Sequence, residues 1–339
     1  MSDTTLLADS VDRMLAQHAD GHAGPPFAEA MWSATAAAGF AGVLADDAGH
    51  PGTDAMRAAA TILRRCARVG APIPIAEAML AAWLAARAGW PDAPGLTSVA
   101  IEGTHIEPSR GSLPAVPWGR HAGHVIALVQ VGNESRLARY DRLVVDAPGH
   151  NLAGEPRDAL RIEAAPLVAD RAIDAREVIA TAALLRAAQL TGAMEATLEL
   201  ALEHAKTRQQ FGRPIGAFQA VQQLLARHAG EVAAAAAAVD LAVDRWDAPS
   251  AVLHAAIAKA RAGEAAGTAA ECAHQVIAAM GFSLEHPLQR LTRRLWTWRD
   301  DYGTESYWND LVGARILAAG ADAAWSVLID EPALVGHPA

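Results

Sequence analysis

Apolar residues recur at helical spacing in the first part of the chain. They stand three and four positions apart in the stretches AMRAAATILRRCARV and AEAMLAAWLAARAG, and near the N-terminus at Leu6, Leu7, Val11, Met14 and Leu15. A repeat of this period places the apolar side chains on one face of an α-helix. We therefore predict an N-terminal helical domain over residues 1–92.

The pattern changes after this segment. Short runs rich in β-branched residues are separated by Gly, Pro, Asn and Asp; they read LTSVAIEG, HVIALVQVG, RYDRLVVDA and ALRIEAAPLV. Such runs are typical of strands, and the residues between them favour turns. We predict a small antiparallel β domain over residues 93–170.

Long helical patterns return from residue 171. Glycine, proline and aspartate interrupt them at residues 212–216, 247–249 and 281–287 and around Gly303. Four or five helices of this length form a bundle. The predicted fold class is mainly α with a small β domain: an N-terminal helical domain, a reduced antiparallel β middle domain, and a C-terminal four-helix bundle over residues 171–339.

Composition and charge narrow the class of protein. The 339 residues are 52% hydrophobic, which is enough for a sizeable core. A formal net charge of −10 disfavours binding to nucleic acid or to an anionic membrane surface. The N-terminal stretch lacks the basic and apolar regions of an export signal, and the Ala-rich runs carry charges that are costly in a bilayer. We expect a globular, cytoplasmic protein that binds neither nucleic acid nor a membrane.

The cysteine and histidine residues indicate neither a disulfide framework nor a metal site. Cys66 and Cys272 stand in Ala-rich helical surroundings, which favours reduced core thiols over a disulfide framework. His254, His274 and His286 lack the spacing of metal ligands, so we expect no metal site.

One stretch interrupts the helices with polar, aromatic and glycine residues. It is KTRQQFGRPIGAFQAVQQLLA, residues 206–226. Taken singly, its arginine would be a solvated helix residue and its aromatics would be core residues. Taken together, they match the signature Arg-x-x-Phe-Gly-x-x-Ile-x-x-Phe-Gln of the acyl-CoA dehydrogenase family at every fixed position: Arg208, Phe211, Gly212, Ile215, Phe218 and Gln219. The stretch therefore resembles that family.

A second stretch, HQVIAAMGFSLEHPLQRLTRR, is similar to the Gln-rich turn of the same family. It matches at Gln275, Gly281, Phe282, Glu285, Pro287 and Arg293, whereas the usual glycines at positions 278 and 279 are alanines. The N-terminal stretches are also similar to the family's first helices, so the resemblance covers nearly the whole chain.

The resemblance implies FAD as cofactor and assigns it a set of binding residues: Arg208, Gln210, Phe211, Gln219, Gln275 and Gly281. An arginine can bond two pyrophosphate oxygens without losing its charge, and the glutamines can bond polar edges of the cofactor. In the family these groups reach across a dimer interface to the neighbour's FAD. They would then serve the cofactor of a partner chain.

The resemblance also implies dehydrogenation of an acyl-CoA thioester, which needs a carboxylate base. The family's Tyr-Glu-Gly-Thr motif reads DYGT here, so Tyr302 occupies the usual base position. A phenol with a pKa of roughly 10 is a poor base near neutrality. The second family position falls near Ala182, which cannot act. The catalytic residue stays unassigned, with Asp301 as a weaker candidate and Glu305 better explained as a first-turn helix acid.

The middle segment lacks the family's Thr-Glu-Pro-x-x-Gly-Ser-Asp loop and its Trp-x-Thr-Asn strand. Shortened members of this kind form one half of heteromeric dehydrogenases of steroid-derived acyl-CoA, paired with a full-length subunit. We expect a subunit of an FAD-dependent acyl-CoA dehydrogenase that completes the FAD site of such a partner. Two alternatives stay open: a non-catalytic structural or regulatory paralogue that dimerises without flavin, and a homodimer that acts alone.

Overall fold

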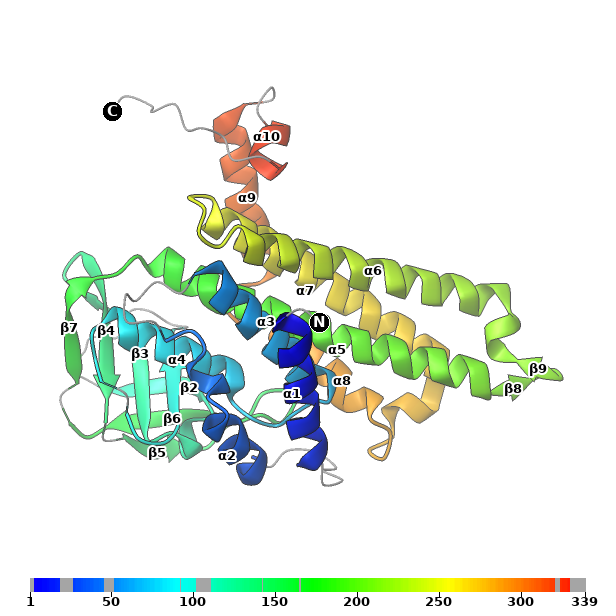
Figure 1. Ribbon diagram of the computed structural model, residues 1–339, viewed down its shortest axis with the longest axis horizontal. Helices are drawn as coiled ribbons and strands as arrows, with labels where there is room; N and C mark the ends of the chain where they lie inside the picture. The colour runs from blue at the N-terminus through cyan, green and yellow to red at the C-terminus, as the bar shows by residue number, and fades with distance from the viewer. Residues whose placement is uncertain are drawn as a thin grey trace.

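The computed structural model describes residues 3–18, 27–45, 52–91, 93–101, 111–141, 143–164, 166–320 and 324–329. Helices come first, strands follow, and long helices complete the chain (Figure 1). The predicted fold class, mainly α with a small β domain, is confirmed in this order of elements. The domain boundaries at residues 92 and 170 stay predictions, and residue 92 itself lies outside the described residues.

Four helices form the first part of the chain: α1 (Asp3–Gln17), α2 (Glu29–Ala37), α3 (Thr53–Arg68) and α4 (Ile75–Arg87). In α3 the buried side chains recur at helical spacing, and its polar residues face outward, as the sequence pattern predicted. Helix α4 is buried along most of its length because it lies between the bundle and the strands.

Seven strands of the described middle segment form two sheets: β1 (Thr97–Ala100), β2 (Ser112–Pro117), β3 (His124–Val131), β4 (Glu134–Tyr140), β5 (Leu143–Ala147), β6 (Arg157–Ile162) and β7 (Leu167–Ala172). One sheet has the order β1-β3-β4-β7 and the other β2-β6-β5. The prediction of an antiparallel unit is wrong for one pair, since β1 and β3 run parallel. After β1 the chain forms β2 in the other sheet before it returns as β3. Because of this crossover, β3 runs parallel to β1, whereas a direct hairpin would have made the two strands antiparallel.

The bundle consists of α5 (Ala175–Thr207), α6 (Gln219–Asp244), α7 (Ala251–Ile277) and α8 (Leu288–Trp298). The first three lie side by side, and α8 packs against α5 and α7 (Figure 1). Helix α9 (Glu305–Ala319) packs on α7 and is followed by α10 (Ala324–Ile329). The predicted breaks between helices are confirmed, because each helix ends before the glycine- and proline-rich stretch that was expected to interrupt it.

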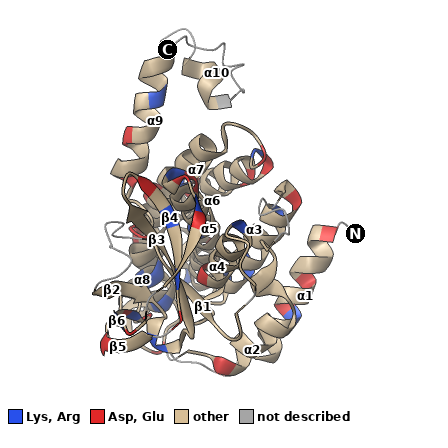
Figure 2. Ribbon diagram, turned by 90° about the vertical axis from the view of Figure 1, so that its left-hand side faces the viewer, with Lys and Arg blue, Asp and Glu red and all other residues tan. Residues whose placement is uncertain are grey.

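Charged and apolar groups are distributed as expected for a folded chain with an interior core. Figure 2 shows positive and negative residues interspersed over the helices and strands. Both cysteines are buried and free, as predicted. Within the ranges that the structure describes, no helix has the length and apolar character needed to cross a bilayer.

A chain of buried ion pairs connects the three parts of the molecule. Arg186, in the middle of α5, donates to Glu77 of α4 at 2.7 Å and lies 3.1 Å from Asp301, which follows α8. Asp301 also accepts a hydrogen bond of 2.9 Å from Arg157 of β6. Both Arg186 and Glu77 are almost fully buried, with side chains 2% and 3% exposed. Because buried charges are costly unless paired, these contacts fix the sheets against the bundle.

A second buried pair lies beside the first. Glu155 accepts hydrogen bonds of 3.0 Å each from the Arg294 guanidinium, the Trp298 indole and the Asn151 amide. Burial opposes ionisation of Glu155, but the nearby guanidinium groups, Arg294 foremost, outweigh it and lower its pKa to about 2.

The core of the bundle depends on close approach between helices. Gly192 of α5 faces the backbone of α3, and a Cβ at this position would lie 2.2 Å from the carbonyl oxygen of Arg64. Only glycine allows the two helix axes to approach this closely.

Replacing Gly192 with Ala is therefore expected to reduce the free energy of unfolding by about 1–3 kcal/mol, because the two helices must separate. Gly230, inside α6, provides the matched control, since nothing lies within 4 Å of a Cβ there. Gly230→Ala should stabilise the protein by about 1 kcal/mol through helix propensity. Urea unfolding of both variants measures the difference. Equal effects of the two substitutions would contradict the close packing of α3 and α5.

The Glu155 pair predicts a specific loss of stability in acid. Because the folded-state pKa of Glu155, about 2, lies below its ordinary value of 4.5, its stabilisation is complete above pH 4.5 and is lost as the pH falls toward 2. The shift corresponds to about 3 kcal/mol. Glu155→Gln should destabilise the protein by a similar amount at pH 7 and weaken its dependence on pH between 5 and 3.

The exposed pair of Glu163 with Arg161 provides the control for this experiment. Glu163→Gln should leave both the stability and its pH dependence nearly unchanged, because exposed ion pairs contribute little. Thermal unfolding from pH 7 to pH 3 distinguishes the two variants. An unaltered acid profile in Glu155→Gln would show that other carboxylates govern the loss of stability.

Candidate functional site

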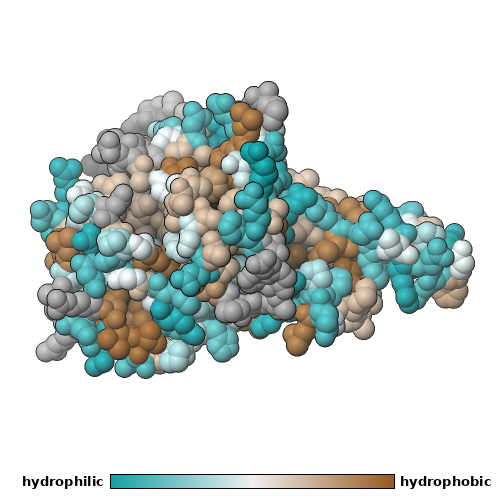
Figure 3. Space-filling view, turned by 60° about the horizontal axis from the view of Figure 1, so that its bottom comes forward, coloured by the Kyte–Doolittle hydropathy of each residue, from teal (hydrophilic) through white to brown (hydrophobic). Residues whose placement is uncertain are grey.

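A hollow of about 1060 Å³ lies at the end of the bundle, where α5 gives way to a short hairpin. The hairpin consists of β8 (Gln209–Gln210) and β9 (Arg213–Pro214), and it lies at the opposite end of α5 from the two sheets (Figure 1). We call this the bundle-end hollow; its polar and aromatic lining is His204, Arg208, Gln210, Phe211, Phe218 and Gln275. Figure 3 shows one end of the bundle as a narrow, mostly hydrophilic arm that projects from the body of the molecule.

The backbone holds the hairpin against the end of α5. The Arg208 N–H donates to the His204 carbonyl at 2.9 Å, and the Arg208 carbonyl accepts from the Ile215 N–H at 2.8 Å. Phe211 and Gly212 form the two-residue turn, with φ of +51° and +78°. Hairpin turns with two positive φ values favour glycine or asparagine, so Phe211 carries about 1–2 kcal/mol of backbone strain. Its side chain is nevertheless 92% exposed, which displays the ring on the surface.

The polar groups of the hollow are free to bind a ligand. In the part of the chain that the structure describes, the side chains of Arg208, Gln210 and Gln275 make no hydrogen bond or ion pair, and no carboxylate lines the hollow. A guanidinium without a carboxylate partner, with amide donors beside it, can bind the oxygens of a phosphate group. These residues fit a pyrophosphate.

Four of the six predicted cofactor-binding residues therefore line one hollow, and two do not. Gln219 is the first residue of α6 and is exposed. Gly281 is buried within the short helix η4 (Ala278–Phe282), where a Cβ would lie 2.7 Å from Leu288. The structure gives Gly281 a packing reason to be glycine, and the cofactor roles of all six residues stay predictions.

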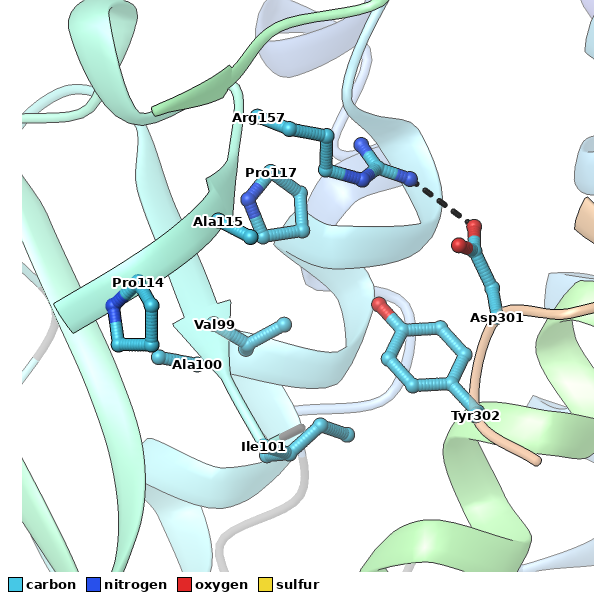
Figure 4. Close-up of a pocket in the computed structure, with 9 residues that line it drawn as sticks. All are labelled: Val99, Ala100, Ile101, Pro114, Ala115, Pro117, Arg157, Asp301 and Tyr302. Atoms are coloured by element: carbon cyan, nitrogen blue, oxygen red, sulfur yellow. Dashed lines mark hydrogen bonds and ion pairs between the residues drawn. The ribbon is translucent and has the colours of Figure 1, made fainter. Parts of the chain in front are cut away.

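A second cavity, the Tyr302 pocket, lies between the strands and the turn after α8. It measures about 430 Å³ and is bordered by residues of β1 and β2, together with Arg157, Asp301 and Tyr302. Figure 4 shows the Tyr302 hydroxyl directed toward the strands and Asp301 turned toward Arg157. The pocket is apolar apart from these side chains and the adjacent backbone.

The carboxylates around this turn are engaged in ion pairs with arginine side chains. Asp301 pairs with both Arg157 and Arg186, so accepting a proton would remove the counter-charge of two buried arginines. Glu305 accepts from the Arg299 guanidinium at 2.9 Å. The side chain of Tyr302 is a phenol and not a carboxylate. None of the described residues that line the Tyr302 pocket is therefore a carboxylate free to act as a base.

A buried lysine fixes the backbone of the same turn. Lys259 of α7 donates to the carbonyl oxygens of Arg299 at 2.6 Å and Gly303 at 2.7 Å. Burial lowers its pKa to about 8, although Asp301 and Glu305 act in the opposite direction. The lysine holds the turn on which Tyr302 stands.

The two cavities are far apart. Arg186 contacts the turn of Tyr302, and Arg208 directly follows the last residue of α5. At a rise of roughly 1.5 Å per residue, the two arginines are separated by about 33 Å along the helix. The bundle-end hollow and the Tyr302 pocket are therefore separate sites.

Backbone strain concentrates at these two cavities. Five described residues other than glycine have positive φ, and four of them line a cavity: Ala115 and Tyr302 at the Tyr302 pocket, and Phe211 and Ala278 at the bundle-end hollow. Strained residues persist where the surrounding structure holds them, and they gather at functional sites. Ala278, with φ of 58° and ψ of −145°, adopts a conformation that favours glycine.

Sequence reasoning missed two groups that the structure makes important. His204 lines the bundle-end hollow one helical turn before Arg208, and this i, i+4 spacing was the available signal. Arg186 was overlooked as a single charged residue within the apolar run ATAALLRAAQLTG. No group of three described His, Cys, Asp or Glu side chains is arranged to hold a metal ion.

Comparison with known proteins gives consistent matches. Residues 173–317 match the model of the acyl-CoA dehydrogenase C-terminal domain. The acyl-CoA dehydrogenase IpdE2 of Mycobacterium tuberculosis is 32% identical over 257 residues, which is 74% of this chain and 75% of that protein. Glutaryl-CoA dehydrogenase of Desulfococcus multivorans is 34% identical over 151 residues, 44% of this chain and 36% of that protein.

Two solved structures share the fold over nearly the whole chain. The ChsE4-ChsE5 complex from Mycobacterium tuberculosis matches with a TM-score of 0.80 and 20% identity, covering 95% of this chain and 99% of that chain. A variant of the Tcur3481-Tcur3483 steroid ACAD matches with a TM-score of 0.81 and 21% identity, covering 94% and 98%. At such identities these matches show the fold alone.

The strain at Ala278 is open to a direct test. Ala278→Gly should relieve about 1–3 kcal/mol of strain at a cost of about 0.5–1 kcal/mol in unfolded-state entropy, for a net gain of about 1 kcal/mol. Ala279→Gly, at a neighbouring residue without positive φ, should lower stability instead. Thermal unfolding of the two variants measures the contrast. A loss of stability in both would mean that Ala278 is not strained.

Proposed function

Because the chain belongs to the acyl-CoA dehydrogenase family, we propose that it is a subunit of an FAD-dependent acyl-CoA dehydrogenase and completes the FAD site of a partner subunit. The bound flavin would accept the hydride that leaves the acyl-CoA when its α,β-bond becomes a double bond. The role of this chain is to bind and position that cofactor through the bundle-end hollow.

One observation carries the proposal: Arg208, Gln210 and Gln275 converge on a hollow that no carboxylate lines. An arginine beside two amides supplies charge and several donors for a doubly charged pyrophosphate. Phe211 adds an exposed apolar face beside them. Arg208, Gln210 and Gln275 are all exposed, so they are accessible to a ligand.

The distance between the cavities supports assignment of this cofactor to another chain. The flavin ring and the pyrophosphate of one FAD molecule are joined by a single five-carbon ribityl chain. That linker is too short to cover the distance of about 33 Å along α5 between Arg208 and Arg186, whose side chain contacts the turn of Tyr302. The flavin ring of an FAD whose pyrophosphate meets Arg208 therefore cannot reach the Tyr302 pocket of the same chain, which favours a flavin site in the partner subunit.

The proton chemistry is assigned to the partner for a related reason. Tyr302 is a phenol, and Asp301 is the counter-ion of two buried arginines. Positioned general-base catalysis contributes about two to four orders of magnitude to such a reaction. We place the base, a carboxylate, on the partner subunit.

The kind of partner and substrate follows by analogy with the structural neighbours. These neighbours are a ChsE4-ChsE5 complex and a Tcur3481-Tcur3483 steroid ACAD. This analogy favours a full-length family member as partner over a second copy of this chain. It also favours a steroid-derived acyl group on the substrate.

The alternative is a structural or regulatory paralogue that dimerises without flavin. The phenol at position 302 and the ion-paired Asp301 favour it. The unpaired donors of the bundle-end hollow favour the enzyme subunit. FAD binding by the assembled complex distinguishes the two.

The test is reconstitution of this chain with full-length members of the family from the same organism. Arg208→Ala should weaken FAD binding by the complex about tenfold to a hundredfold, as expected for a lost charged hydrogen bond. Arg227→Ala, an exposed arginine on α6 outside the hollow, is the control and should leave FAD binding unchanged. Visible absorbance of the flavin after gel filtration measures occupancy.

Tyr302→Phe adds a catalytic arm to the same experiment. Turnover of a steroid-derived acyl-CoA by this variant complex should match that of the unaltered complex, because the hydroxyl has no part in proton transfer. Robust activity of the lone chain that disappears in Tyr302→Phe would overturn the proposal. Unchanged FAD binding in Arg208→Ala would refute the assignment of the hollow.

A further inference from the structure

His204 is a titratable group of the bundle-end hollow that neither the fold nor the proposed function uses. It lies one helical turn before Arg208, lines the same hollow and is only partly buried. Within the described part of the chain its ring makes no hydrogen bond or ion pair. It also stands in the last turn of α5, where the helix dipole favours a cation.

We propose that His204 is a second phosphate-binding residue of the hollow, which takes up a proton when a pyrophosphate docks on Arg208. The inference rests on the proposed function, because it takes the diphosphate group of FAD as the ligand. It deepens that function by making cofactor binding dependent on pH and selective for a doubly charged diphosphate.

In the ligand-free protein the surroundings favour the neutral imidazole. Burial is the largest influence, and Arg208 and His286 add to it, so the pKa of His204 lies below its ordinary value of 6.5. His286, which precedes α8, accepts the Leu288 N–H at its Nδ1. The other cation of the hairpin, Arg213, lies over the Phe218 ring at 4.3 Å. Of the arginine and lysine residues that the structure describes, Arg208 alone lines the hollow.

A bound pyrophosphate would reverse this balance. Its two negative charges beside Arg208 offset the repulsion that the guanidinium exerts on the imidazole, and they attract a second proton-bearing group. No carboxylate of the hollow competes for that proton. The pKa of His204 must then rise on binding, and by linkage the diphosphate must bind more tightly as the pH falls.

The size of the effect follows from the same linkage. Each unit by which binding raises the pKa corresponds to about a tenfold change in affinity between low and high pH. A ligand with one negative charge would raise the pKa less and would show a weaker dependence on pH. The hollow is thus expected to prefer dinucleotides joined by a pyrophosphate over ligands that carry a single phosphodiester.

The experiment uses the purified full chain with ADP-ribose and FAD as probes, because their diester pyrophosphates do not titrate between pH 5.5 and 8.5. The His204 ring signal is identified in proton NMR spectra by its absence from His204→Gln, and its pKa is measured with and without ADP-ribose. Calorimetry in two buffers of different ionisation enthalpy counts the protons taken up on binding.

We expect the pKa of His204 to rise on addition of ADP-ribose, and affinity to fall about tenfold from pH 5.5 to 8.5. His204→Gln should lose this dependence on pH and keep the binding that Arg208 provides. His204→Lys, which stays charged over this range, should bind tightly at all these pH values. His150→Gln, at an exposed histidine outside the hollow, is the control and should behave like the unaltered chain.

The outcomes separate this inference from the proposed function. If Arg208→Ala weakens binding but the pKa of His204 stays the same or falls, the inference is wrong and the proposed function stands. If Arg208→Ala leaves binding unchanged, both are overturned. If neither probe binds the lone chain at millimolar concentration, the inference is wrong, and the proposed function, which requires the partner subunit, stands. An equal pH dependence in His204→Gln would also reject the inference.

Discussion

The buried ion pairs of Glu77, Arg186, Asp301 and Arg157 are the constraint on which the arrangement of the molecule depends. They join a helix of the first part, the longest helix of the bundle, the turn after α8 and a strand. Each charge is acceptable in the interior only because its partner is present, and removing one partner of such a pair costs about 3–5 kcal/mol. Hydrophobic packing alone would tolerate small shifts between sheet and bundle, whereas this network requires one relative position.

The same network explains why the Tyr302 pocket is poorly suited to acid–base chemistry. Asp301 contributes its charge to two guanidinium groups, and Lys259 holds the backbone carbonyls on either side of Tyr302. Rigidity and charge compensation at this turn leave no carboxylate of the pocket available to accept a proton. A residue that holds the structure together here cannot also serve as the base.

The opposite end of α5 follows a different physical principle. There a small apolar cluster separate from the main core, which includes Ala205, Ile215 and Val276, supports a hairpin whose side chains point outward. Phe211 and Ala278 accept strained backbone, and Arg208 lacks a counter-ion among the described residues. The strained backbone lowers the stability of the isolated chain, and a ligand or partner that binds the exposed groups would offset that loss. The charged groups near Arg186 of α5 are buried and paired, whereas Arg208, beside the C-terminal end of α5, is exposed and has no ion-pair partner among the described residues.

The sequence by itself determined the helix–strand–helix order, the breaks between the bundle helices and the motif around Arg208, because these depend on local periodicity, turn residues and fixed spacing. By resemblance to the family, it also predicted that Tyr302 occupies the usual base position. Only the tertiary structure decided that β1 and β3 are parallel, that Arg186 reaches Glu77 and Asp301, and that Gln219 and Gly281 do not line the hollow. Those facts depend on contacts between residues far apart in the chain. A local sequence pattern does not predict such partners, because the burial and pairing of a charge depend on the whole fold.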